Sequence, residues 1–231
     1  MTQQATQPDT TSTIGGSTLA YLFADRFVLK EQPGKSGMKA FGTGAVVVTK
    51  ELSAGLVAIA LWQLREQGAV TLEAYSAKKF GLISTSGVRV GLVGTVPARG
   101  VEKQILDHLQ GSKRGREGRE TAFDVANLIA RGGRDPHGVV IRKAIDDAVE
   151  LGCLERVQHD VGMVARARGK GSTLEPIADR IAALAPAAQA LAEGWREFRT
   201  GAEQPLAKLL RSTTYDGIET LARDRDDLIS D

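Results

Sequence analysis

The chain has 231 residues, 42% of them hydrophobic and 5% aromatic, and its 30 lysines and arginines nearly balance its 28 aspartates and glutamates. This length allows a sizeable core, in one large domain or two small ones, and the balanced charge argues against nucleic-acid binding through bulk charge. The single cysteine, Cys153, excludes an intrachain disulfide and favours a reducing, cytoplasmic compartment.

Residues 1–16 are rich in Thr, Gln and Ser, which predicts a disordered tail. This start lacks the basic and hydrophobic segments of a secretory leader. The longest apolar run near the central helix, 54–62, is far shorter than the ~20 residues that a membrane span needs. We therefore expect a cytoplasmic protein that meets a membrane, if at all, from its surface. Residues 17–231 are expected to form a single helical domain, with possible sub-units 17–110 and 120–231.

The ordered part is expected to open with a short helix from Leu19, which Ser17 or Thr18 is predicted to cap. A proline-glycine turn follows. Residues 38–48 are interrupted by glycines and are predicted to end in a short strand or in the first turn of the next helix.

The most hydrophobic helical stretch, residues 52–72, is predicted to be the element around which the rest of the protein packs. Its apolar side chains cover nearly the whole circumference of a helix, which indicates burial on most sides. Burial of each Leu or Ile contributes about 1.5–3 kcal/mol, so we expect this helix to contribute more to stability than any other segment. Gly68 ends the helix, and a strand follows over residues 69–73.

Residues 75–82, with Lys78 and Lys79, are predicted to be a turn, and residues 87–93 a second strand. Helix, glycine, strand, turn and strand is the order of a winged-helix unit. It is equally the order of a helix that packs on its own hairpin, and the pattern leaves both interpretations open.

A second copy of the helix–glycine–strand pattern lies in the second half of the chain. Helix 139–151, Gly152 and strand 153–157 repeat it 84 positions later, counted from Gly68 to Gly152. The recurrence indicates either an ancient repeat or a shared packing solution. Between the two copies the pattern predicts a helix over 101–109, a charged loop over 111–120, a helix over 122–130 capped by Thr121, and a loop over 131–138. Beyond them it predicts helices over 174–184, 187–198, 205–210 and 215–228.

The sequence offers no constellation typical of catalysis or metal binding. None of the three histidines, His108, His137 and His159, lies at metal-ligand spacing from a cysteine or a second histidine. His137 is expected in a surface loop beside Asp135, and Cys153 is expected to be a buried, inert thiol.

Residues 168–173 resemble a phosphate-binding loop, but Gly171 follows the lysine where that pattern needs Ser or Thr. We therefore predict no nucleotide site, although a basic loop ahead of a helix can still hold a phosphate or an anionic headgroup. No catalytic residue, metal or cofactor is expected, and we interpret the chain as a non-enzyme.

Basic residues gather in three clusters. Each cluster is interpreted as a solvated loop; if two of the clusters lie on one face of the protein, they form an anion site. The clusters are Lys78 and Lys79; Lys113, Arg114, Arg116 and Arg119; and Arg166, Arg168 and Lys170. Near an anionic membrane each basic residue contributes about 1 kcal/mol, whereas on DNA the same residues give weak, salt-sensitive binding. Base readout needs donors on an exposed helix face, which the apolar helix lacks, so nucleic acid is the less favoured partner.

Five further features follow one another between residues 18 and 157. They are Thr18-Leu19-Ala20 before an apolar segment and a turn at Gly34; Ala54-Gly55-Leu56 leading to Leu64-Arg65-Glu66-Gln67-Gly68 and Val70-Thr71-Leu72-Glu73; Val96-Pro97-Ala98-Arg99-Gly100 before a helix with Ile105-Leu106-Asp107; a helix after a charged loop; and Val149-Glu150-Leu151-Gly152-Cys153-Leu154. In this order and spacing the chain resembles the Golgi phosphoprotein 3-like family, whose members occur widely in actinobacteria.

The resemblance implies a mainly α fold whose buried helices are ringed by amphipathic helices, with small β-hairpins in winged-helix-like helix–glycine–strand units. Eukaryotic members bind a phosphorylated phosphoinositide headgroup and act as peripheral membrane adaptors. The family's arginine on the central helix falls at Val57, its two arginines on the long helix fall near Ile141 and at Lys143, and its pocket tryptophan falls among residues 46–48. We therefore expect the family's headgroup site to be lost or rebuilt.

These observations predict a non-enzymatic peripheral membrane or adaptor protein, whose partner is an anionic lipid headgroup or another protein. The residues expected to bind the anion are Arg142, Lys143, Arg166, Arg168 and Lys170. The alternative is a tandem winged-helix protein that binds DNA or serves as a protein-interaction module.

Overall fold

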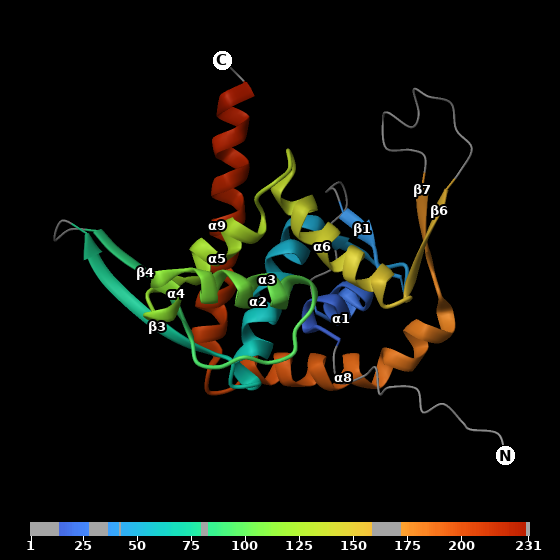
Figure 1. The fold of residues 1–231 in the computed structure, drawn as a ribbon, viewed down its shortest axis with the longest axis horizontal. Coiled ribbons are helices and arrows are strands. Elements are labelled where there is room, and N and C mark those ends of the chain that lie inside the picture. The colour runs from blue at the N-terminus through green and yellow to red at the C-terminus, as the bar shows by residue number, and fades with distance from the viewer. Residues whose placement is uncertain (1–13, 28–36, 42, 80–82, 159–171, 230–231) are drawn as a thin grey trace.

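The computed structural model describes residues 14–27, 37–41, 43–79, 83–158 and 172–229 (Figure 1). Its helices are α1 (Gly16–Leu22), the 3-10 turn η2 (Ala24–Arg26), α2 (Thr49–Glu66), α3 (Gly100–Gly111), α4 (Lys113–Arg116), α5 (Ala122–Ile129), α6 (Pro136–Glu150), α8 (Ala178–Thr200) and α9 (Gln204–Ile229). Its strands are β1 (Gly37–Lys39), β2 (Val46–Val48), β3 (Val70–Lys79), β4 (Ile83–Leu92), β5 (Glu120–Thr121), β6 (Leu154–Gln158) and β7 (Ser172–Pro176). The fold is mainly α, as the sequence predicts.

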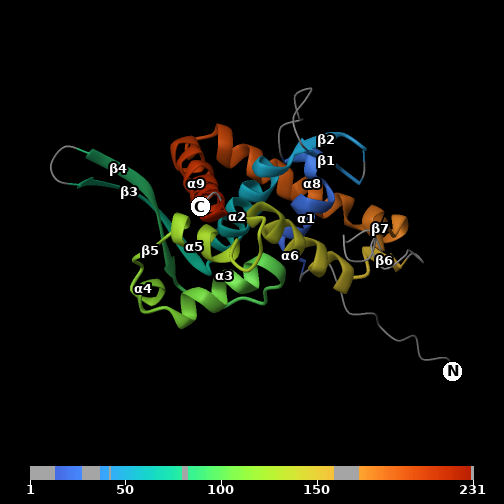
Figure 2. The ribbon, with the colours of Figure 1, turned by 90° about the horizontal axis from the view of Figure 1, so that it is seen from above.

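Helix α2 is the buried axis of the fold. Every residue from Leu52 to Trp62 is buried, because apolar side chains surround the helix on all sides. Helices α1, α3, α6 and α9 pack against it, and Figure 2 shows α2 in the middle of the molecule. The prediction that the rest of the protein packs around this helix is confirmed.

The start of the ordered chain differs from the sequence prediction. Gly15, and neither Ser17 nor Thr18, is the N-cap of α1, and both of those residues lie buried inside its first turn. Ile14 is also buried, so the last residues of the predicted tail belong to the core, whereas residues 1–13 lie outside the described residues. The cap prediction was wrong because the first turn bonds to carboxylates that lie far away in the sequence.

Strands β3 and β4 form a ten-residue antiparallel hairpin, with Val70 opposite Leu92 and Lys79 opposite Ile83. The two-residue strand β5 pairs with the other edge of β4. The turn predicted over 75–82 is wrong for residues 75–79, which belong to β3, and residues 80–82 are not described. From Tyr75 to Ala77 the strand has no buried residue, so no apolar alternation marks it in the sequence. The hairpin extends away from the helices (Figure 1).

The two helix–glycine–strand units end their helices in the same way. Gly68 and Gly152 both adopt positive φ, at 73° and 67°, in the left-handed region that glycine enters without strain. The next residue then donates its backbone N–H to the carbonyl five positions back, from Ala69 to Leu64 and from Cys153 to Ala148, both at 2.9 Å. The two units therefore share a helix-ending geometry, and an ancient repeat stays a prediction.

The C-terminal helices are longer than predicted, and one expected helix start is wrong. Residues 172–176 form β7, which pairs with β6, so no helix begins at 174. Helix α8 continues through Pro186, which is exposed, and α9 continues through Thr213 and Thr214. The two threonine hydroxyls donate to carbonyls one turn earlier in α9, which lets these residues stay within a helix.

Candidate functional site: an arginine-lined groove beside the β3–β4 hairpin

The described residues of the predicted anion site do not form one site. Arg142 is exposed and its guanidinium lies beside Gly133, whereas Lys143 points into a cavity between α3 and α6. Neighbouring positions on a helix face different directions, so one ligand cannot reach both side chains. Arg166, Arg168 and Lys170 lie outside the described residues.

The cavity at Lys143 has a volume of about 510 Å³ and a lining unsuited to an anion. Burial lowers the pKa of Lys143, whose ammonium donates to the side-chain oxygen of Gln104. The charged lining residues comprise four carboxylates against three cations: Asp107, Asp146, Asp147 and Glu150 against Arg99, Lys103 and Lys143. An excess of carboxylates disfavours a phosphate in this cavity.

The positions that match the family's headgroup arginines are part of the core. Val57 has no exposed surface and Ile141 is only 7% exposed, so neither position offers a charge or access to a ligand. The expectation that the family's site is lost or rebuilt stays a prediction, and three described arginines meet at another place.

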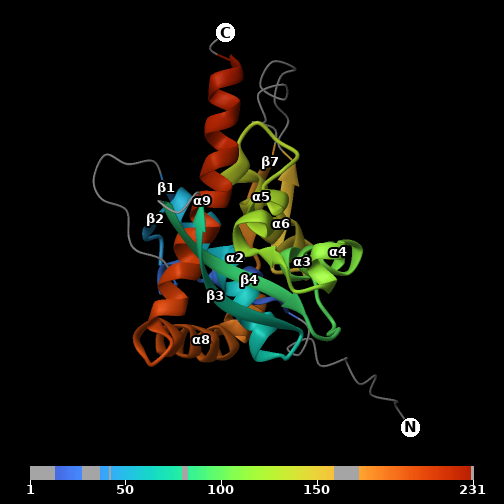
Figure 3. The same ribbon diagram turned by 90° about the vertical axis from the view of Figure 1, so that its left-hand side faces the viewer.

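Three arginines meet in a groove of about 500 Å³ that lies between the hairpin and the turn α4. It is lined by three arginines, one tyrosine and one threonine: Arg89, Arg114, Arg119, Tyr75 and Thr121. No carboxylate is among these lining residues. Figure 3 shows the hairpin with α9 on one side and α3 and α4 on the other. The sequence had pointed to Arg114 and Arg119 as one basic cluster but not to Arg89 or Tyr75.

Strand pairing sets the position of Arg89. Arg89 lies opposite Glu73 and two positions beyond Gly87, the partner of Tyr75, so the guanidinium reaches diagonally across the hairpin to Tyr75. Its carbon lies 5.2 Å from the centroid of the Tyr75 ring, within the range of a cation–π interaction. Within the described ranges of the chain, no carboxylate lies within 4 Å of Arg89, so its charge is free for an anionic ligand.

The other two arginines have carboxylate partners. Arg114 donates to Asp124 Oδ2 at 3.2 Å and to the backbone carbonyl of Arg119 at 3.3 Å. Arg119 donates to the carboxylate of Glu117. Because these four side chains are about one third or more exposed, water weakens both ion pairs, and an incoming phosphate can compete for the guanidinium groups.

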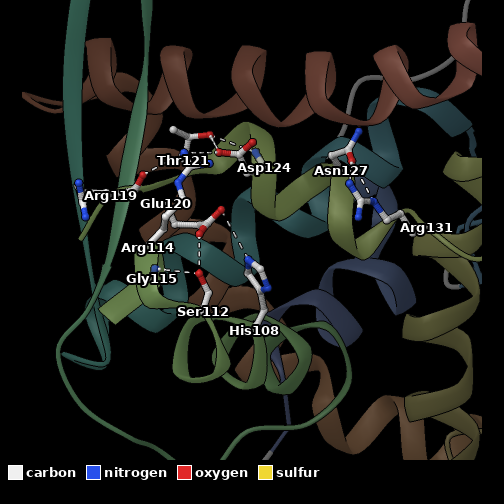
Figure 4. A network of polar contacts seen from close by, with 10 residues as sticks. All are labelled: His108, Ser112, Arg114, Gly115, Arg119, Glu120, Thr121, Asp124, Asn127 and Arg131. Carbon is white, nitrogen blue, oxygen red and sulfur yellow. Dashed lines mark hydrogen bonds and ion pairs between the residues drawn. The ribbon is translucent and has the colours of Figure 1, made fainter. Parts of the chain in front are cut away.

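A polar network below the groove holds the turn that carries Arg114 (Figure 4). Ser112 Oγ accepts the N–H of Gly115 at 3.1 Å, which caps α4, and donates to Glu120 Oε2 at 3.0 Å. The other carboxylate oxygen of buried Glu120 lies 3.7 Å from His108 Nε2. This nitrogen is the one buried side-chain N or O atom in the described part of the chain that has no hydrogen-bond partner.

Thr121 begins the next helix at the wall of the groove. Its hydroxyl accepts the N–H of Asp124 at 3.1 Å and donates to Asp124 Oδ2 at 2.8 Å. The predicted Thr121 cap of α5 is confirmed. The cap also fixes the position of the Asp124 carboxylate, so the same side chain holds both the start of α5 and Arg114.

The groove continues toward α9 in a second part of about 330 Å³. This part shares Tyr75, Arg114 and Thr121 with the first. Its remaining lining residues are Ser86, Phe123, Asp124, Thr213 and Asp216. The groove therefore runs from an arginine-rich end at the hairpin to an end with carboxylates and hydroxyls at α9.

A buried serine–histidine–glutamate chain lies elsewhere in the core. The expectation that His137 lies in a surface loop is wrong, because this residue is buried in the first turn of α6. Its Nδ1 lies 2.7 Å from Ser53 Oγ and its Nε2 lies 3.1 Å from Glu219 Oε2. Ser53 has no exposed surface, so no substrate reaches its hydroxyl, and the three hydrogen-bonded side chains link α2, α6 and α9.

Other predicted features have plain structural roles. Cys153 is buried as predicted, and burial raises the pKa of its thiol. Among the residues placed by the structure, no three His, Cys, Asp or Glu side chains are arranged to hold a metal ion. None of the described helices combines the length and apolar character required to cross a bilayer.

Comparisons of the chain with protein-family models, with curated proteins and with solved structures find no match. The resemblance to the Golgi phosphoprotein 3-like family therefore rests on the order and spacing of its motifs, and it remains a prediction.

Proposed function

We propose that the protein is a non-enzymatic peripheral membrane or adaptor protein of the Golgi phosphoprotein 3-like kind, which binds anionic phospholipid headgroups in the arginine-lined groove. The observation that supports this proposal is the convergence of Arg89, Arg114 and Arg119 on one cavity without a carboxylate in its lining. Planar guanidinium groups bind phosphate oxygens through paired hydrogen bonds, so three of them around one cavity suit a phosphate.

The groove and its rim favour reversible attachment to a membrane. Lys113 and Arg116 are exposed on the same α4 turn as Arg114, so five basic residues gather here. At about 1 kcal/mol for each residue near an anionic surface, they supply roughly 5 kcal/mol. This is little more than the free energy of about 4 kcal/mol that corresponds to a dissociation constant near 1 mM. The attachment is therefore expected to be weak and to be reversed by salt.

The winged-helix alternative is less consistent with α2. A recognition helix exposes polar side chains to the major groove, whereas Leu52 to Trp62 of α2 are all buried. The basic groove could still contact a nucleic-acid backbone without reading bases. The experiment therefore also measures DNA binding.

The experiment is cosedimentation of the full chain with phosphatidylcholine vesicles that contain increasing fractions of anionic lipid, alongside a DNA mobility assay at two salt concentrations. The proposal predicts binding that rises with anionic content and falls with salt. Absence of vesicle binding, together with tight and sequence-dependent DNA binding, would overturn the proposal in favour of the winged-helix alternative.

A further inference from the structure

The two ends of the groove carry opposite charges that form no ion pair among the described residues. At the hairpin end, Arg89 has no carboxylate partner within 4 Å among the described residues. At the α9 end, Asp216 is exposed and, among the same residues, has no cation within 4 Å and no hydrogen bond from another side chain. Both residues line cavities that share three residues, so the two ends belong to one continuous groove.

The residues in the middle of the groove do not supply a further free charge of either sign. Arg114 and Thr121 both bond to Asp124, so this cation and this carboxylate neutralise each other. Tyr75 is the remaining shared lining residue, and its ring lies below the guanidinium of Arg89. The groove therefore places a cation at one end, a neutral middle, and a carboxylate at the other end.

We propose that the groove binds a zwitterionic phosphorylated amine, with its phosphate at Arg89 and Arg119 and its ammonium group at Asp216. This inference rests on the proposed function, since it uses the same groove, and it adds the class of ligand. A ligand with only negative charge leaves Asp216 facing its anion, whereas an ammonium group at that end forms a favourable pair with the carboxylate.

The α9 end favours a primary amine over a quaternary one. An ammonium group has three N–H donors, and this end offers the Asp216 carboxylate and the Ser86 hydroxyl as acceptors. A trimethylammonium group has no N–H, and it binds best within several aromatic faces. Apart from Tyr75, which lines both parts, Phe123 is the single aromatic residue in the lining of the second part. Ethanolamine phosphate is therefore expected to bind more tightly than choline phosphate.

The test is titration calorimetry of the full chain with inorganic phosphate, O-phosphoethanolamine, phosphocholine and ethanolamine. O-Phosphoethanolamine is expected to bind at least about tenfold more tightly than phosphate, a difference of about 1.4 kcal/mol. The D216N variant is expected to lose this preference without binding phosphate more weakly than the wild type does. R89Q is expected to weaken binding of every phosphate compound. D179N removes an exposed carboxylate on α8 and serves as the matched control.

Vesicles separate a lipid headgroup from a free metabolite as the source of this chemistry. At equal anionic content, phosphatidylethanolamine in place of phosphatidylcholine is expected to increase binding if the ligand is a lipid, and to have no effect if it is a free compound. Equal affinities for phosphate and O-phosphoethanolamine in the wild type would overturn the ligand class, even if anionic vesicles still bind. Absence of binding to both phosphate compounds and anionic vesicles would overturn the proposed function as well.

Discussion

Replacing Glu102 by glutamine is predicted to remove a loss of stability that the wild type undergoes as the pH rises through about 7. Glu102 on α3 is only 2% exposed, and its carboxylate accepts the backbone N–H of Ser17 at 2.7 Å and the Ser17 hydroxyl at 2.6 Å. Burial, together with nearby Asp147, raises the pKa of Glu102 from 4.5 to about 7, although the hydrogen bonds from Ser17 oppose the shift. A carboxyl group in this position is therefore most stable when it is protonated.

The sign of the pH dependence follows from the raised pKa. Between pH 4.5 and about 7 the folded protein keeps a proton on Glu102 that the unfolded chain has released. The stabilisation from this group is fully present below pH 4.5 and is lost as the pH rises through about 7. A shift from 4.5 to about 7 corresponds to about 3 kcal/mol, which is an upper bound.

The assay is urea unfolding of the wild type and E102Q at several pH values from 4.5 to 8. Glutamine can accept the Ser17 N–H and donate to its hydroxyl without carrying a charge. The free energy of unfolding of E102Q minus that of the wild type is expected to rise by up to about 3 kcal/mol from pH 4.5 to pH 8. E175Q, at an exposed position of β7, is the control and should show no such rise. A constant difference across this range would refute the reasoning.

Three further substitutions test the core, the helix end and the predicted site. Leu56→Ala in the buried α2 is expected to cost about 2–5 kcal/mol in urea unfolding, whereas Val93→Ala, at a 63% exposed position, should cost little; equal costs would contradict the buried axis. Gly68→Ala is expected to lower stability by about 1 kcal/mol because the left-handed backbone strains an alanine; unchanged stability would count against that geometry. The double variant Arg142→Gln, Lys143→Gln should bind anionic vesicles within about twofold of the wild type, because neither side chain lines the arginine-lined groove; a larger loss would support a site at these two residues.

The sequence was most informative where a structure depends on neighbours along the chain. The apolar circumference of α2, the glycine stop at Gly68 and the Thr121 cap all follow from local spacing. The same reasoning predicted the first turn of α1 incorrectly. Its polar residues bond to Glu102 and Asp147, which lie 85 and 129 positions away in the chain. Local capping rules contain no information about such partners.

The candidate groove could be predicted only in part for the same reason. Arg114 and Arg119 are near neighbours and appear as a basic cluster in the sequence. Their meeting with Arg89 and Tyr75 depends on the register of the hairpin and on its pairing with β5. From Glu73 to Ala77 strand β3 has no buried residue, so the apolar alternation that marks strands is absent there. Charge clusters therefore identified candidates, and strand pairing determined which of them converge.

The central claim is that the arginine-lined groove binds anionic membranes, and vesicle cosedimentation of two triple variants tests it most directly. The groove variant R89Q/R114Q/R119Q and the control variant R134Q/R180Q/R196Q lose the same charge, and the control residues are all exposed and away from the groove. Circular dichroism melts establish that both variants fold. The account predicts that the groove variant loses at least about tenfold in vesicle affinity, or about 1.4 kcal/mol, while the control stays within about twofold. Equal losses in the two variants would contradict the account, because they would show that net charge alone, rather than the groove, attracts the membrane.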